Sequence, residues 1–145
     1  MTNSGTISFL FHLTPFRLRQ RQAVRDWLAR CVHQEGKRVE ELNYMFSTDD
    51  YVLSMNEAHL NHSYFTDILT FPTPSGQGIC GDILISIDRT RDNAKHLKTN
   101  PLDELHRVMA HGALHLIGYN DDSESNKKEM RHREDQWLSQ RSFLD

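Results

Sequence analysis

The chain has 145 residues, 37% of them hydrophobic, and a formal net charge of −3 at pH 7. That length fits a single domain, residues 1–145, with one hydrophobic core. The small negative charge argues against a protein that holds nucleic acid by bulk electrostatic attraction. No apolar run approaches the roughly 18 residues that span a membrane, and residues 1–21 lack a signal-peptide pattern. We therefore expect a soluble, cytoplasmic protein with no membrane contact.

Hydrophobic periodicity in the first half of the chain predicts three strands alternating with two helices. Apolar residues recur at helical spacing in the segment at 19–34, and Leu42, Tyr44 and Phe46 alternate with their neighbours in the segment at 39–48. Asp49 or Asp50 is expected to cap the second helix, and Pro72 to stop the third strand. The expected elements are a strand at 7–13, a helix at 19–34, a strand at 39–48, a helix to residue 60 and a strand at 68–71.

The second half of the chain predicts one more strand and then three helices. The helix that follows Asn100-Pro101 is apolar on most sides, so it is expected to be the most buried. The elements predict an α+β fold in which helices cover a small, mixed four-stranded sheet, with that helix central. The expected elements are a loop at 72–78, a strand introduced by Gly81 with alternating Ile83, Ile85 and Ile87, a helix capped by Asp88 and running to 97, the central helix, and a helix at 124–140.

Residues 111–121, which read His-Gly-Ala-Leu-His-Leu-Ile-Gly-Tyr-Asn-Asp, are the most informative segment. Two histidines four apart on a helix point to the same side, so His111 and His115 are within reach of one metal ion. Gly118 lets the chain turn back, and Asp121 is placed to return as a third, oxygen ligand. Two nitrogens and a carboxylate with one open position form a recognised pattern for catalytic zinc.

Other interpretations of these residues remain open. His111 and His115 can instead bond to the backbone or to neighbouring side chains. Asp121 and Glu124 have the spacing of a capping box, so Asp121 can be a helix cap. Gly112 stands where many zinc peptidases carry the glutamate that acts as general base, which argues against peptide hydrolysis by that route.

Three ordered motifs link the chain to a known family. Residues 66–72 read Thr-Asp-Ile-Leu-Thr-Phe-Pro, residues 81–86 read Gly-Asp-Ile-Leu-Ile-Ser, and residues 111–119 contain the two histidines. With these motifs the chain resembles the YbeY family, bacterial metal-dependent endoribonucleases that act in ribosomal RNA maturation. The family motif continues with aspartate and a third histidine, where this chain has Asn120 and Asp121.

The resemblance implies one zinc ion held by His111, His115 and Asp121, with His111 as a catalytic residue. The implied activity is cleavage of single-stranded RNA in maturation of the 3′ end of small-subunit ribosomal RNA. The implied partners are the small ribosomal subunit and ribosome-associated proteins. The metal would polarise the scissile phosphate, activate a water, or both. Because Asp121 is anionic, we expect a slightly less acidic bound water and easier entry of harder metals such as manganese.

A second departure from the family concerns phosphate binding. The family arginine, thought to face the metal cleft, aligns with Leu60, which cannot hold a phosphate. His59 and His62 are candidate replacements. A basic cluster at 127–133 is interpreted as a solvated helix face. The first candidates for contact with the RNA backbone recur at every fourth residue: Arg17, Arg21 and Arg25.

Two other functions remain as alternatives. One is a non-catalytic ribosome-assembly factor in which the metal is structural, which Leu60 favours somewhat. The other is a different metal-dependent hydrolase, against which Gly112 speaks in the case of a standard peptidase.

Overall fold

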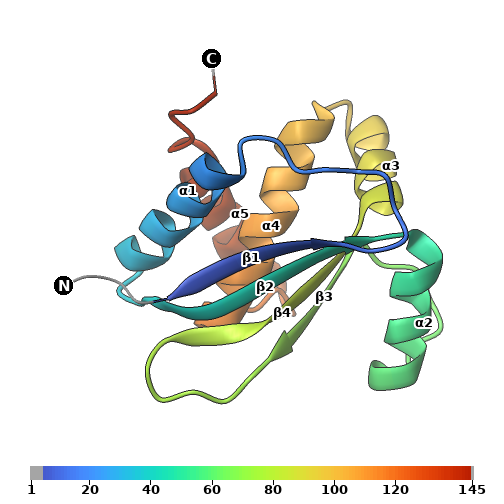
Figure 1. The fold of residues 1–145 in the computed structure, drawn as a ribbon, viewed down its shortest axis with the longest axis horizontal. Helices are drawn as coiled ribbons and strands as arrows, with labels where there is room; N and C mark the ends of the chain where they lie inside the picture. Colours follow the sequence, from blue (N-terminus) through green and yellow to red (C-terminus); the bar gives the residue numbers. More distant parts are fainter. Residues whose placement is uncertain (1–4, 145) are drawn as a thin grey trace.

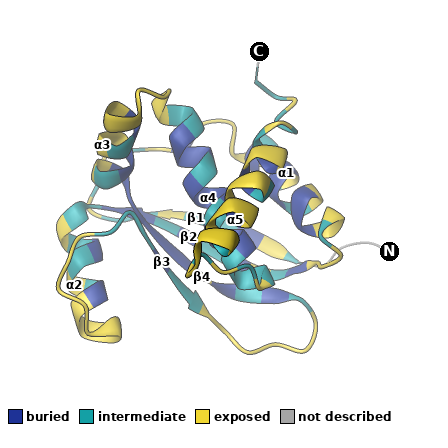
Figure 2. Cartoon of the chain, turned by 180° about the vertical axis from the view of Figure 1, so that it is seen from behind, coloured by how far each residue is buried: buried dark blue, intermediate teal, exposed yellow. Residues whose placement is uncertain are grey.

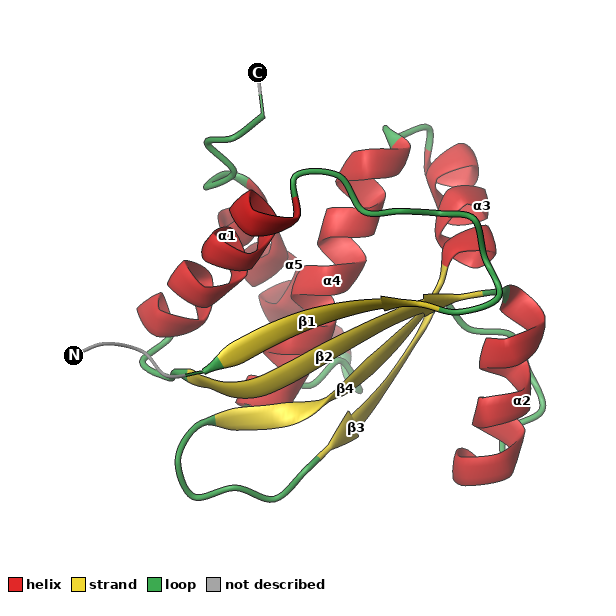
Figure 3. Cartoon of the chain, in the orientation of Figure 1, coloured by secondary structure: helices red, strands yellow, loops and turns green. Residues whose placement is uncertain are grey.

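The computed structural model of the chain describes residues 5–144. Within them, strands and helices follow one another in the order that the sequence predicts (Figures 1 and 3). The elements are β1 (Thr6–Phe11), α1 (Arg21–Gln34), β2 (Val39–Ser47), α2 (Asp49–Leu60), β3 (Ile68–Pro72), β4 (Ile79–Ser86), α3 (Ile87–Leu97), α4 (Pro101–Ile117) and α5 (Glu124–Leu138).

The strands form one mixed sheet in the order β1-β2-β4-β3. β1, β2 and β4 run parallel, and β3 pairs antiparallel with β4. Helices α1, α4 and α5 cover one face of the sheet (Figure 1). On α2, Val52 forms a smaller apolar cluster with Leu69 and Leu84 of the sheet. The α+β class and the small mixed sheet covered by helices are therefore confirmed. Within residues 5–144, no helix has the length and apolar character needed to cross a membrane.

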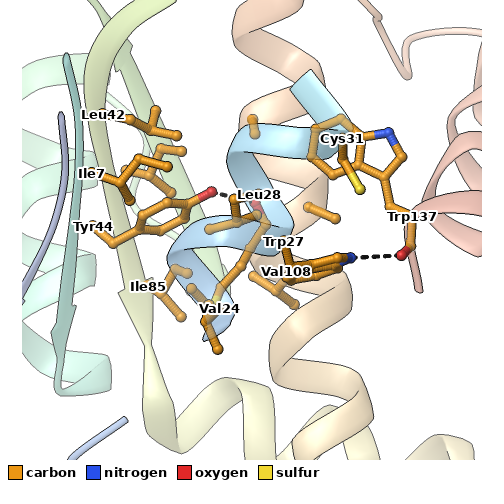
Figure 4. Packing of buried hydrophobic residues seen from close by; sticks show 14 of the residues in the cluster. Ile7, Val24, Trp27, Leu28, Cys31, Leu42, Tyr44, Ile85, Val108 and Trp137 are labelled. Carbon is orange, nitrogen blue, oxygen red and sulfur yellow. Dashed lines mark hydrogen bonds between the residues drawn. The ribbon is translucent and has the colours of Figure 1, made fainter. Parts of the chain in front are cut away.

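Two hydrogen bonds tie the helices to one another and to the sheet. The hydroxyl of Tyr44 on β2 donates to the carbonyl of Met109 on α4 at 2.8 Å. The indole Nε1 of Trp27 on α1 donates to the carbonyl of Trp137 on α5 at 2.7 Å, and both rings lie in the main core (Figure 4). These bonds satisfy polar groups that would otherwise be buried without a partner. The first joins α4 to the sheet, and the second joins α5 to α1.

Helix α4 is the central helix, as the sequence predicts. It packs against α1, α3, α5, β3 and β4, and most of its length is buried, whereas α5 exposes its outer side (Figure 2). Gly112 allows this close packing: a Cβ at that position would lie 2.9 Å from both Ile68 Cδ1 and Ile83 Cγ2. Because residue 112 faces the sheet, a glutamate there would not reach a metal bound by the histidines.

Two helix caps differ from the sequence prediction. Thr48, not Asp49 or Asp50, caps α2, since its hydroxyl accepts a hydrogen bond from the Tyr51 amide at 3.2 Å. Ser86, rather than Asp88, caps α3 in the same way. In both places a hydroxyl residue precedes the aspartates on extended backbone, which suits a cap, and the aspartates occupy the first turn, where negative charge is favourable.

Element ends also differ where the backbone adopts positive φ or where a strand runs further than expected. Leu13, with φ 59°, lies beyond β1, and Gln20, with φ 54°, precedes α1. β4 begins at Ile79, so Gly81 lies inside the strand rather than before it, and Ile87 is the first residue of α3. A Cβ at Gly81 would lie 2.8 Å from the carbonyl oxygen of Phe71, which explains the glycine.

Candidate metal centre

The last turns of α4 bring His111 and His115 together. Their rings are stacked with centroids 5.8 Å apart, as expected for side chains one turn apart on a helix. Both histidines line a cleft of about 860 Å³, and Asp121 lines the same cleft from the segment after α4. Gly118 ends the helix with φ 130°, a conformation that favours glycine, and turns the chain back toward the histidines.

Each histidine is hydrogen-bonded through Nδ1. The Nδ1 of His115 lies 2.8 Å from the carbonyl oxygen of Tyr119, and the Nδ1 of His111 lies 2.7 Å from Oε2 of Glu134. A carbonyl or carboxylate oxygen can only accept, so Nδ1 carries the proton in both rings. In the neutral tautomer this leaves both Nε2 lone pairs available. A hydrogen bond at one ring nitrogen is the usual way in which proteins orient a metal-binding histidine.

Glu134 is the buried partner of His111. It lies on α5 with its side chain almost fully buried, and Arg107 of α4 holds its other oxygen at 2.8 Å. Burial alone would lower the pKa of His111, but the hydrogen bond and charge of Glu134, together with Asp121, raise that pKa above its ordinary value. Without a metal, His111 therefore holds its proton more strongly than an isolated histidine does.

Asp121 faces His111 and does not cap α5. Its Oδ2 lies 3.4 Å from Nε2 of His111. The cap of α5 is Ser123, whose hydroxyl accepts from the amide of Asn126 at 3.0 Å, and Asp122 accepts from the Asn126 side chain. The capping-box interpretation of Asp121 is wrong, because the chain offers a hydroxyl two residues later, on extended backbone. The carboxylate of Asp121 therefore makes no capping hydrogen bond to α5.

The donor chemistry of this cluster suits a divalent ion. Two imidazole nitrogens and a carboxylate oxygen are ligands that zinc accepts. Within residues 5–144, no three His, Cys, Asp or Glu side chains are already gathered around one point at metal-binding distances. Asp121 is about half exposed, so its side chain has room to turn toward a shared ion. We expect a small local rearrangement when a metal binds.

Positive charge lines the same cleft. Arg107 is engaged by Glu134 and by Asp135, which lies 2.6 Å from its second terminal nitrogen. Lys127 and Arg131, exposed on α5, also line the cleft and form no salt bridge with any residue that the structure describes. These two side chains are therefore free to bind an anion. The sequence predicts a solvated helix face for this basic cluster. At Lys127 and Arg131 that exposed face is also part of the cleft wall.

The residues predicted for RNA binding lie in different places. Leu60, at the position of the family arginine, lines the cleft, and so does His62. His59 does not line it, and its ring packs edge-on against Phe71, with centroids 5.8 Å apart. The arginines of the predicted stripe also lie outside the cleft lining, and their guanidinium groups sit over phenylalanine rings of β1: Arg17 and Arg21 over Phe11, and Arg25 over Phe9.

Sequence reasoning missed Glu134 and Arg107. Glu134 lies 23 residues after His111, so no local spacing links the two. A signal was nevertheless present: the buried residues of α5 are Met130, Glu134 and Trp137, which places a carboxylate on the apolar stripe of an amphipathic helix. A buried carboxylate needs a partner, and the nearby helix carries the histidines.

Comparison with known proteins gives a consistent result. Residues 14–142 match the family model described as endoribonuclease YbeY. The endoribonuclease YbeY of Cytophaga hutchinsonii is 48% identical over 139 residues, covering 95% of this chain and 97% of the relative. That of Flavobacterium johnsoniae is 42% identical over 126 residues, covering 87% and 91%. The solution structure of TM1509 from Thermotoga maritima has a TM-score of 0.67 at 23% identity, covering 94% of this chain and 89% of that one, which supports the fold.

Proposed function

The chain belongs to the endoribonuclease YbeY family, and on that basis we propose that it is a metal-dependent endoribonuclease that acts in ribosomal RNA maturation. The observation that carries the metal-dependent part is the pair of imidazoles in the cleft whose Nδ1 atoms are both engaged by hydrogen-bond acceptors. With Nδ1 occupied, the nitrogen left in each ring for a metal is Nε2.

We propose that the metal is zinc and that His111, His115 and Asp121 hold it. A bound zinc ion supplies a Lewis acid that polarises a phosphate and favours the deprotonation of water. Imidazole ligands favour zinc over magnesium or calcium, whereas the carboxylate of Asp121 widens the choice toward manganese. The engaged Nδ1 atoms and the absence of a capping role for Asp121 support this ligand set.

The other side chains of the cleft position these groups and the substrate. Glu134 fixes the tautomer and orientation of His111, and Arg107 holds Glu134 in place. Lys127 and Arg131 contact phosphates of the RNA strand, since both are exposed in the cleft and form no salt bridge within residues 5–144. They supply the positive charge that Leu60 cannot.

The substrate class follows from the local character of this charge. The chain is slightly acidic overall, so it has little long-range attraction for RNA. Two unpaired cations in one cleft suit a short stretch of single-stranded RNA that another particle presents. We propose the small ribosomal subunit, with the 3′ end of its RNA, as that particle.

A cleavage assay with purified protein tests the proposal. The protein is stripped of metal with a chelator and then given back zinc, and a labelled single-stranded RNA, the matching duplex and a DNA strand are supplied as substrates. We expect zinc-restored cleavage of the single-stranded RNA alone, and its loss in His111→Ala. Cleavage that survives both chelation and His111→Ala would indicate a contaminating nuclease and contradict the assignment.

A further inference from the structure

One part of the cleft wall carries exposed rings. The end of α2 contributes Leu60 to the lining, and the segment between α2 and β3 contributes His62 and Tyr64. Tyr64 is 57% exposed and Leu60 41% exposed. The rings of His62 and Tyr64 are stacked, with centroids 5.1 Å apart and planes inclined by 20°, and the Tyr64 hydroxyl lies 3.0 Å from Nδ1 of His62. Together they form a flat aromatic surface beside the metal ligands.

This surface is held by the helix beneath it. Asn56, only 1% exposed on α2, donates from its side-chain amide to the carbonyl of Tyr64 at 3.0 Å. The carbonyl of Asn56 accepts from the amide of His62 at 3.2 Å. Asn61, with φ 57°, lies between Asn56 and His62 in the chain and ends helix α2. The backbone of the segment is therefore held at both His62 and Tyr64, which lowers the entropic cost of ordering it when a ligand binds.

The basic residues of the same cleft indicate which ligand the rings meet. Lys127 and Arg131 line the cleft and form no salt bridge within residues 5–144, so the occupant has an anionic side and a flat side. Single-stranded nucleic acid has both, and proteins bind it with cations along the backbone and aromatic rings on which unpaired bases stack. A duplex would hide the faces of its bases from such a wall.

We propose that Tyr64, with His62 stacked on it, is a platform for an unpaired base of the RNA strand whose phosphates contact Lys127 and Arg131. This inference rests on the proposed function for the identity of the ligand. It adds a binding residue outside the metal ligands and gives a physical reason for a preference for single strands. Stacking tolerates all bases because each has a π-face, so the platform favours unpaired over paired RNA rather than one sequence.

The test measures binding rather than cleavage. A short fluorescent single-stranded RNA with 2′-fluoro substitution at each residue is titrated onto the protein, and an abasic strand of equal length and the same backbone serves as the second probe. We expect Tyr64→Ala to weaken binding of the first probe roughly 5- to 150-fold, the range for loss of one stacked base. Binding of the abasic strand is expected to be unchanged, and Tyr64→Phe is expected to keep most of the affinity.

Phe65→Ala is the matched control. Phe65 is the adjacent exposed ring, 46% exposed, but it does not line the cleft and packs under the guanidinium of Arg89 at 4.9 Å. Its removal should leave binding of both probes as in the wild type. Equal affinity of Tyr64→Ala and wild type, or an equal loss for the abasic strand, would overturn the platform. These outcomes are independent of cleavage, so a protein that binds as expected but does not cut RNA would overturn the proposed activity and leave the platform.

Discussion

Glu134 on α5 accepts a hydrogen bond from Nδ1 of His111 on α4, with 2.7 Å between the two atoms. The bond spans the contact between two helices and joins the buried side of the cleft to a candidate metal ligand. Arg107 holds the same carboxylate from the other side at 2.8 Å. The orientation of His111 therefore depends on how α4 and α5 pack.

Glu134→Gln should weaken metal binding. The amide carries no charge and makes the Nδ1 proton less strongly held, and loss of such an outer partner typically costs about 10- to 100-fold in metal affinity. Zinc affinity measured by competition with a chromophoric chelator gives the result. Glu129→Gln on the exposed side of the same helix, where Glu129 pairs with Arg133, is the control and should bind zinc as the wild type does. Equal affinities for both variants would rule out the orienting role.

Zinc affinity should rise with pH. The pKa of His111 is raised above its ordinary value, so a proton must leave its imidazole before Nε2 can bind metal. Below that raised pKa the affinity should increase by about tenfold per pH unit, and above it the increase should lessen. Titrations between pH 6 and pH 8 measure this slope, and Glu134→Gln should move it to lower pH. An affinity that does not change across this range would contradict the assignment of His111 as a ligand.

In the metal-free protein, the raised pKa of His111 should make the stability of the fold fall as the pH rises. The protonated His111 pairs with Glu134, and this contribution to stability is fully present below the unfolded pKa of about 6.5. It is lost as the pH rises through the raised pKa of the folded state. Urea unfolding of the chelator-treated protein at several pH values, compared between wild type and Glu134→Gln, measures it. The difference between the two proteins should shrink toward higher pH, and a difference that grows would be inconsistent with the raised pKa.

Asp121→Ala and Ser123→Ala should separate metal binding from helix capping. Because Ser123 caps α5, its replacement should lower the free energy of unfolding by about 1 kcal/mol and leave zinc binding unchanged. Asp121→Ala should change the stability of the metal-free protein by no more than about 0.5 kcal/mol, as for a surface position. Denaturant unfolding of the metal-free proteins distinguishes the two. A larger loss for Asp121→Ala than for Ser123→Ala would restore the capping interpretation.

Lys127→Ala should weaken RNA binding, whereas Lys128→Ala should not. The two lysines are adjacent on α5, and only Lys127 lines the cleft. Loss of one phosphate contact should reduce the dependence of log affinity on log salt by about 0.7 for a single strand. Binding measured at several salt concentrations gives that slope, and Arg131→Ala should behave as Lys127→Ala does. The same slope change for Lys128→Ala would mean that charge acts over the whole helix rather than in the cleft.

Gly112→Ala should destabilise the fold. The added Cβ would meet Ile68 and Ile83 at 2.9 Å, and overpacking of this kind costs about 1–3 kcal/mol. Gly76→Ala is the control, because a Cβ there meets nothing within 4 Å. Thermal and urea unfolding of the two variants measure the difference. Full stability of Gly112→Ala would mean that α4 does not lie against β3 and β4 as described.

The order of the elements could be read from the sequence because it depends on local patterns. Alternation in β2 and helical periodicity in α1 reflect one buried side of each element, and Asn100-Pro101 begins α4 as predicted, with Asn100 accepting from the amide of Leu102. The caps were less accessible because aspartate, threonine and serine are all good caps. Only the backbone conformation decides between neighbours such as Thr48 and Asp49.

Some features of the candidate site could likewise be predicted from the sequence, and others depend on how the helices pack. The spacing of His111 and His115 is a property of one helix, so it was visible in the sequence. The contact of His111 with Glu134 depends on how two helices pack, and so does the position of Lys127 in the same cleft as Tyr64. Only Arg21 and Arg25 lie on α1, because the helix begins at Arg21 and Arg17 precedes it, so the predicted stripe of three arginines on one helical face is wrong. The sequence also could not indicate that β1 supplies the rings beneath all three.

The central claim is that His111, His115 and Asp121 hold one metal ion. Elemental analysis of the purified protein after equilibration with zinc, in parallel with His115→Ala and Asp121→Ala, tests it most directly. We expect one zinc per wild-type chain and clearly less in both variants, with folding confirmed by circular dichroism. One zinc per chain in all three proteins, or none in the wild type, would contradict the claim.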